Sequence, residues 1–258
     1  MTLYTTKYAP KNINQIFGQD TAVHKLKDFL QHYKTQKTKI ALCYGPIGVG
    51  KTSSVYTLAK ELDFDLLEIN SSDLRNADSI KTFLGSALGQ QSLFFRPKII
   101  LIDEIDNISG VKDRGCIPAL LKAIESSTFP IIATANDIFD SKLKPLKKIA
   151  LNIEFHKLQY RTIAHALEWV AQQEGIEYEE KAINSLARQV DGDLRGALID
   201  LQSCGNPFTF EKVATLSDRK RTDSIINSLR IIFKSSDINN ALPALNDVDV
   251  NLDEVFLW

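Results

Sequence analysis

The chain has 258 residues, of which 44% are hydrophobic and 24% are charged, and its formal net charge is −1. This length and apolar content suffice for two or three domains with cores of their own. The near-neutral charge excludes a global positive field that would draw the chain to nucleic acid, so any such contact must be a local patch.

Nothing in the sequence indicates a membrane protein. No apolar run approaches the length of a membrane span, and the polar start Met1-Thr2-Leu3-Tyr4 is unlike a signal peptide. Cys43, Cys116 and Cys204 lie far apart without the spacing of metal ligands, as expected of reduced thiols. We therefore expect a cytoplasmic protein without a membrane partner.

Strands and helices alternate through residues 1–155. After an irregular, aromatic-rich opening, the predicted helices are 19–33, 53–61, 78–88 and 115–125, and the predicted strands are 40–44, 64–69, 99–102, 131–135 and 149–155. Continuous apolar strands that alternate with helices are typical of a parallel sheet covered by helices on both faces. Ligands of such sheets bind beyond the carboxyl ends of the strands, so polar residues there are candidate site residues.

The pattern becomes all-helical from residue 156. The apolar spacing predicts helices over 161–173, 180–190 and 193–203, and Gly205-Asn206-Pro207 then breaks the run. Residues 207–258 hold further helices but too little apolar surface for a core of their own. We therefore predict three parts: an α/β domain over 1–155, a helical domain over 156–206 and an incomplete helical domain over 207–258.

A phosphate-binding motif connects the first strand to the next helix. The stretch Gly45-Pro46-Ile47-Gly48-Val49-Gly50-Lys51-Thr52, followed by Ser53, fits G-x-x-x-x-G-K-[ST]. Its glycines let backbone N–H groups point at phosphate oxygens, Lys51 adds a charge for the β- and γ-phosphates, and the Thr52 hydroxyl is a magnesium ligand. A glycine-rich turn without a ligand is the alternative, which the flanking strand and helix disfavour. The motif predicts a nucleoside-triphosphate site.

Two acids follow the strand 99–102. Asp103 can hold Mg²⁺ together with Thr52, and Glu104 can orient and polarise the attacking water. The alternative is that both residues cap the next turn. The pair predicts that the site hydrolyses its nucleotide.

Two further polar residues extend this prediction. Asn136 follows the strand 131–135 and can reach the γ-phosphate or the attacking water, although an Asn in this place is also a common turn residue. Arg195 lies in a first helical turn, where the helix dipole disfavours a cation by up to ~1 kcal/mol. Contact with ATP from the helical domain is one explanation of Arg195, and a solvated surface arginine is the other.

These motifs, in this order, resemble the AAA+ ATPases. Within them the chain resembles clamp-loader subunits of the replication factor C type, and more narrowly the archaeal-type large subunit. The narrower likeness extends over essentially the whole chain and rests on Lys7-Tyr8-Ala9-Pro10, Glu68-Ile69-Asn70-Ser71-Ser72-Asp73-Leu74-Arg75, Ser92-Leu93-Phe94, Ile102-Asp103-Glu104, Asp113-Arg114-Gly115, Thr134-Ala135-Asn136-Asp137, Gly192-Asp193-Leu194-Arg195 and Asp253-Glu254-Val255-Phe256-Leu257-Trp258.

The resemblance implies an AAA+ P-loop domain, a helical lid and the first helices of a collar domain. It implies that Asn136 and Arg195 are the two sensor residues of an ATPase that uses Mg²⁺, with Tyr8, Phe17 and Gly18 around the adenine. The implied function is opening and loading a sliding DNA clamp at primer–template junctions, together with small subunits. Two alternatives stay open: a stator that binds ATP without hydrolysing it, and another AAA+ nucleic-acid ATPase for origin binding or branch migration.

The resemblance also implies contacts with partners. Arg75, Lys81, Lys112 and Arg114 lie on segments that track DNA phosphates in this family, although each alone is more often a solvated charge. Leu93, Phe94 and Phe95 resemble a clamp-binding stretch, with a loop tucked under the sheet as the alternative. Small subunits carry a Ser-Arg-Cys trio whose arginine reaches a neighbour's ATP. This chain lacks the trio near the strand that precedes Asn136, which fits a large subunit that receives an arginine finger and does not donate one. Because that arginine must come from a neighbour, we expect weak hydrolysis outside an assembly.

The sequence departs from the family pattern in two places. Ala9 stands where the family usually has an arginine, so any polar contact of that arginine is absent. The large subunit normally continues beyond its Phe-x-Trp stretch, whereas this sequence stops at Trp258. We expect either part of a longer polypeptide or one half of a subunit encoded in two pieces, with a second chain that completes the collar.

Overall fold

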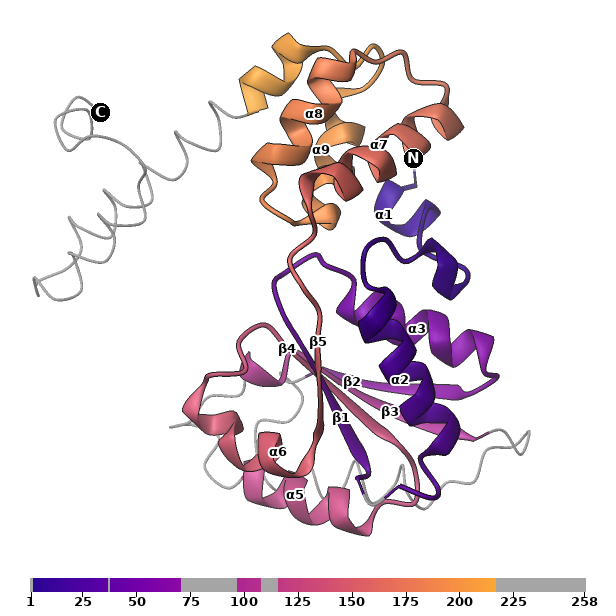
Figure 1. Ribbon diagram of the computed structural model, residues 1–258, viewed down its shortest axis with the longest axis vertical. Coiled ribbons are helices and arrows are strands. Elements are labelled where there is room, and N and C mark those ends of the chain that lie inside the picture. The colour runs from indigo at the N-terminus through magenta and orange to yellow at the C-terminus, as the bar shows by residue number, and fades with distance from the viewer. Residues whose placement is uncertain (1, 37, 71–96, 108–115, 217–258) are drawn as a thin grey trace, which may run out of the picture.

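The computed structural model describes residues 2–36, 38–70, 97–107 and 116–216 of the chain. Figure 1 shows a larger part built around a sheet and a smaller helical part beyond one end of that sheet. Residues 78–88, predicted as a helix, and the predicted third part from residue 217 onward lie outside the described residues.

A parallel sheet of five strands forms the centre of the larger part. The strands lie in the order β2-β3-β4-β1-β5. Their bounds are β1 Ile40–Tyr44, β2 Asp65–Asn70, β3 Lys98–Asp103, β4 Ile131–Ala135 and β5 Leu151–Glu154. β4 pairs with both β1 and β3, with Cys43 opposite Thr134 and Ile102 opposite Ala133. The residues that follow these three strands therefore meet at one edge of the sheet.

Helices cover both faces of the sheet, as predicted from the sequence (Figure 1). Alternate strand residues point to opposite faces. In β1, Ala41 and Cys43 belong to the core beneath α2 and α3, whereas Ile40 and Leu42 belong to the core beneath α5 and α6. The helices have the bounds α2 Asp20–His32, α3 Lys51–Glu61, α5 Cys116–Ser126 and α6 Lys144–Ile149, and short 3-10 turns have the bounds η1 Ile13–Gln15, η3 Ile105–Asn107 and η4 Ser141–Leu143.

The smaller part contains α7 (Tyr160–Glu174), α8 (Glu180–Gln189) and α9 (Leu194–Cys204). The short helix α1 (Tyr4–Lys7) packs on this part rather than on the sheet, and Tyr4 N donates to Gln202 Oε1 at 2.8 Å (Figure 1). The side-chain amide of Gln19, the N-cap of α2, holds the segment between β5 and α7, because it donates to His156 O at 2.6 Å and accepts from His156 N at 3.1 Å. Among the described residues, no helix is long and apolar enough to cross a membrane.

Two local predictions were wrong. The strand predicted over 149–155 begins only at Leu151, because Ile149 is the last residue of α6. Pro145 stands in the first turn of α6, where its fixed backbone angle favours a helix, and the helix buries Leu146. The opening was predicted as irregular, yet residues 4–7 form α1, whose first N–H group is satisfied by Gln202 of the distant helix α9.

Candidate nucleotide-binding site

The loop between β1 and α3 needs glycine at two positions. Gly45 has a φ of 147°, and a Cβ there would lie 2.0 Å from the carbonyl oxygen of Phe155. Gly48 has a φ of 71°, and a Cβ there would lie 1.6 Å from Asp193 Oδ1. Backbone strain and close contact therefore both exclude a side chain at these two residues. The loop ends at Gly50, the N-cap of α3.

Lys51 is held at the base of this loop. Its side chain is 8% exposed, and Nζ donates to Gly45 O at 2.7 Å, Pro46 O at 2.7 Å and Asn136 Oδ1 at 2.9 Å. Burial lowers the pKa of Lys51, while the carboxylates of Asp106 and Asp103 oppose that shift. The ammonium group is thus positioned by protein acceptors at the start of the helix that would face a phosphate.

Thr52 and Asp103 face each other across the site. Thr52 Oγ1 donates to Asp103 Oδ1 at 2.9 Å, and Thr134 Oγ1 donates to the same oxygen at 2.6 Å. A hydroxyl and a carboxylate held this close are oxygen ligands of the kind that Mg²⁺ prefers. The side chains present therefore fit a magnesium ion held by Thr52 and Asp103.

Glu104 has an unusual backbone conformation. Its φ is 53°, a left-handed value that costs a residue other than glycine roughly 1–3 kcal/mol. The Glu104 N–H donates to Thr134 Oγ1 at 2.9 Å, and Glu104 Oε2 accepts from Asn107 Nδ2 at 2.7 Å. The exposed Glu104 carboxylate lines the cavity beside Asp103. Strain of this kind occurs at functional sites, because the surrounding structure must hold it.

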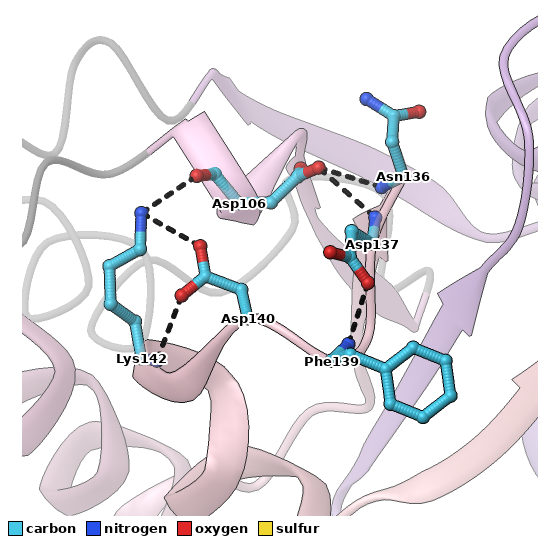
Figure 2. A network of polar contacts seen from close by, with 6 residues as sticks. All are labelled: Asp106, Asn136, Asp137, Phe139, Asp140 and Lys142. Carbon is cyan, nitrogen blue, oxygen red and sulfur yellow. Dashed lines mark hydrogen bonds and ion pairs between the residues drawn. The ribbon is translucent and has the colours of Figure 1, made fainter. Parts of the chain in front are cut away.

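Asn136 directly follows β4 and contacts Lys51 in this site. Its side-chain oxygen accepts from Lys51 Nζ, and its backbone N–H donates to Asp106 Oδ2 at 2.8 Å. Figure 2 shows Asp106 between Asn136, Asp137 and Lys142, with the aromatic ring of Phe139 pointing away from this network. The adjacency of β3 and β4 is what places Asp106 against the backbone of Asn136.

One cavity of about 230 Å³ joins these residues to the N-terminal segment and to the helical part. The sequence-predicted residues that line it are Tyr8, Phe17, Ile47, Gly48, Val49, Gly50, Lys51, Thr52, Ser53, Asp103, Glu104, Asn136 and Arg195. Gly18, Gly45 and Pro46 do not line it. Gly18 instead packs near Leu158 at the start of the helical part, while the carbonyls of the other two hold Lys51.

Aromatic side chains also line the cavity. Tyr8 meets Trp169 edge to face with ring centroids 5.4 Å apart, and both residues line the cavity. Tyr8 Oη donates to Glu174 Oε1 at 2.6 Å, which ties the N-terminal segment to α7. A cavity lined by aromatic rings as well as by the Lys51 side chain suits a ligand with a flat base and a phosphate chain.

Sequence reasoning missed four residues of this site: Thr134, Asp106, Asp193 and Trp169. Thr134 has the clearest signal in the sequence, since it precedes Asn136 by two residues and strand side chains alternate with a period of two. The other three take their places from strand order and from the packing of the helical part. The predicted DNA contacts Arg75, Lys81, Lys112 and Arg114 and the predicted clamp contacts Leu93, Phe94 and Phe95 lie outside the described residues.

The fold and site agree with the comparison to known families. Residues 41–157 match the ATPase family associated with various cellular activities (AAA). The RuvB Holliday junction branch migration motor of Thermotoga maritima superposes with a TM-score of 0.66, covering 94% of this chain and 86% of that chain at 17% identity. This likeness concerns the fold alone. Residues 41–157 therefore resemble an AAA ATPase domain with a P-loop, and the predicted fold class is confirmed.

Sequence relatives narrow the class further. Replication factor C large subunits are 39% identical over 98% of this chain in Nanoarchaeum equitans, 37% over 98% in Staphylothermus marinus and 36% over 100% in Methanothrix thermoacetophila. The resemblance to archaeal replication factor C large subunits is thereby confirmed over nearly the whole chain. The chain spans 59%, 61% and 56% of the length of these relatives.

Proposed function

We propose that the chain is an ATP-dependent clamp-loader subunit. With small subunits, it would open a sliding DNA clamp and load it at primer–template junctions during DNA replication. The observation that carries this proposal is the likeness of nearly the whole chain to large subunits of replication factor C. The division into a nucleotide-binding domain (1–155), a lid (156–206) and the start of a collar (207–258), completed by a second chain, is part of the proposal.

The site geometry supports ATP hydrolysis. Residues 45–53 hold the phosphates, with Lys51 as the cation nearest the β- and γ-phosphates. Thr52 and Asp103 hold Mg²⁺, which, when bound, neutralises charge on the phosphates. Glu104 orients the attacking water, and Asn136 and Arg195 contact the γ-phosphate from β4 and α9. Tyr8 and Phe17 contact the adenine, and Gly18, which does not line the cavity itself, directly follows Phe17.

Hydrolysis in this proposal depends on assembly. Residues of this chain supply every part of the site except an arginine from a neighbouring subunit. An arginine finger supplied in trans accelerates phosphoryl transfer by roughly 10³–10⁵-fold. The chain therefore hydrolyses ATP slowly when alone and rapidly when a small subunit completes the site. In the cell it works in the cytoplasm at the nucleoid, where primed DNA is found.

Two sets of residues outside the described part of the chain belong to the proposed interfaces. Arg75, Lys81, Lys112 and Arg114 track DNA phosphates, so each true contact that is removed should reduce the salt dependence of DNA binding by about one unit. Leu93, Phe94 and Phe95 enter an apolar pocket of the clamp. Replacing these three residues by alanine is expected to abolish clamp binding and to leave ATP binding intact.

Clamp loading tests the proposal. The chain is combined with small subunits, clamp and primed DNA from one organism, and loaded clamps are counted with ATP present. We expect loading by the unaltered chain and none with Lys51→Ala. Glu104→Gln separates the alternatives, because a stator would load clamps equally well with this change. Activity on four-way junctions without any clamp loading would instead favour a branch-migration ATPase.

A further inference from the structure

A third carboxylate, Asp106, follows Asp103 and Glu104 in the sequence and lies outside the nucleotide cavity. Asp106 belongs to the 3-10 turn η3, which directly follows β3 and packs against the end of β4. It does not line the cavity, so it cannot contact a nucleotide there itself. Any influence on the nucleotide must pass through the residues that Asp106 contacts.

The Asp106 side chain holds the backbone at the end of β4. Asp106 Oδ2 accepts from Asn136 N at 2.8 Å and from Asp137 N at 3.4 Å (Figure 2). Asp106 Oδ1 is buried and has no hydrogen-bond partner among the residues that the structure describes. Hydrogen bonds that involve an ionised group are stronger than neutral ones, and burial strengthens them further. The position of Asn136 therefore depends on Asp106.

The same turn is tied to the loop beyond Asn136 through a second contact. Lys142 Nζ donates to the backbone oxygen of Asp106 at 3.2 Å and pairs with Asp140 Oδ2 at 3.0 Å. The segment from Asn136 to Lys142 is thus fastened to η3 at both ends (Figure 2). Asp28 on α2 has an exposed side chain outside this network, so it offers a control.

Asn136 is consequently held from two sides. Lys51 Nζ donates to its side-chain oxygen at 2.9 Å, while Asp106 accepts from its backbone. The Asp106 carboxylate also opposes the burial that lowers the pKa of Lys51, so it favours the charged form of the lysine across the site. Lys51 and Asn136 line the nucleotide cavity and Asp106 supports both of them from outside it.

We propose that Asp106 is a positioning residue that fixes Asn136 against Lys51 in the geometry that hydrolysis of the γ-phosphate requires. This inference rests on the proposed ATPase function. Removal of a group that only positions a sensor lowers the rate of the chemical step and has little effect on the ground-state affinity for ATP. An isosteric acceptor at residue 106 should preserve the positioning even without the charge.

Three measurements on the full chain test this role: hydrogen exchange of the Asn136 amide, ATP affinity by calorimetry, and single-turnover ATP hydrolysis. For Asp106→Ala we expect about tenfold faster exchange and about tenfold slower hydrolysis, with ATP affinity within about twofold of the unaltered chain. Asp106→Asn keeps an acceptor oxygen and should recover most of both losses. Asp28→Ala should change none of the three quantities.

A double variant decides whether Asp106 acts through Asn136. If it does, Asp106→Ala combined with Asn136→Ala hydrolyses ATP no more slowly than Asn136→Ala alone. Losses that multiply, or an Asn136 amide whose exchange does not respond to Asp106→Ala, would overturn the inference. If the unaltered chain hydrolyses no ATP, either alone or assembled, the proposed function is overturned instead. Amide exchange would still test whether Asp106 fixes the backbone of Asn136.

Discussion

The carboxylate of Asp193 packs directly on Gly48 of the phosphate-binding loop. A Cβ at Gly48 would lie 1.6 Å from Asp193 Oδ1, and this same oxygen accepts from Gly196 N at 2.9 Å as the N-cap of α9. The helix that carries Arg195 therefore begins on top of the loop that would hold the phosphates. Because the contact leaves no room for a side chain, the loop and the helical part cannot meet in this way unless residue 48 is glycine.

Gly48→Ala should therefore separate the helical part from the phosphate-binding loop. The added methyl group must displace Asp193, and its φ of 71° is unfavourable for alanine. We expect ATP affinity to fall by about tenfold or more, equivalent to about 1.4 kcal/mol. Gly175→Ala is the matched control, since Gly175 has a φ of 64° but nothing within 4 Å of the added group. Equal ATP affinities for the two variants would contradict the prediction.

The Thr134 hydroxyl should matter for hydrolysis although it was not predicted from the sequence. It donates to Asp103 Oδ1 and accepts from the N–H of Glu104, so it supports both acids. Thr134→Val removes the hydroxyl and leaves a partly buried N–H without its acceptor, which costs about 1–3 kcal/mol of stability. We expect about tenfold slower hydrolysis and a lower Tm.

Thr134→Ser retains the hydroxyl and is the control for this change. Single-turnover hydrolysis and thermal unfolding of both variants provide the measurement. If the serine variant loses as much activity as the valine variant, the methyl group rather than the hydroxyl is what the site requires.

The charge state of Lys51 should make ATP binding depend on pH. Burial lowers the pKa of Lys51 below its ordinary value of 10.5. At a pH between the lowered pKa of folded Lys51 and 10.5, Lys51 is protonated in the unfolded chain and neutral in the folded chain. The contribution of Lys51 to the free energy of unfolding therefore rises with pH in this window. Phosphate charge favours the ammonium form, so ATP binding takes up as much as about one proton in this window and weakens as the pH rises.

Calorimetric titration in two buffers with different heats of ionisation measures this proton uptake. Lys51→Arg is the control, because a guanidinium group stays charged throughout the window. The uptake should disappear in the arginine variant. Uptake of the same size in both proteins would assign the proton to another group.

Trp169 should report nucleotide binding through its fluorescence. The sequence contains two tryptophans, and Trp169 lines the cavity beside Tyr8. A base placed against these rings changes the surroundings of the indole, so ATP should alter the emission of the full chain. Trp169→Phe should abolish the change and keep the affinity within about twofold, because both side chains present an aromatic ring to the cavity. A change that survives in the phenylalanine variant would place the base elsewhere.

Sequence patterns predicted those parts of the structure that local chemistry determines. Strand β1 was predicted with the bounds that the structure has. Its five residues, 40–44, are apolar and are followed directly by Gly45, which the phosphate-binding loop requires. Asp103, Glu104 and Asn136 were found because polar residues that follow buried strands of a parallel sheet gather at one edge. In each case, residues that are close in the sequence determine the local structure.

Features that arise from packing between distant segments could not be predicted in this way. The four-residue helix α1 has no side-chain cap of its own and is held by Gln202 of α9. Asp106 reaches Asn136 only because β3 and β4 are neighbours, and Asp193 reaches Gly48 only because α9 begins above the loop. Neither relationship is visible without the order of the strands and the place of the helical part.

ATP turnover of the chain alone, compared with its turnover when small subunits, clamp and primed DNA are present, tests the central claim most directly. We predict a rise of about 10³-fold or more on assembly, as expected when an arginine from a neighbour completes the site. Lys51→Ala in this chain should remove its share of the turnover in the assembly. Turnover by the isolated chain that equals turnover in the assembly would contradict the account.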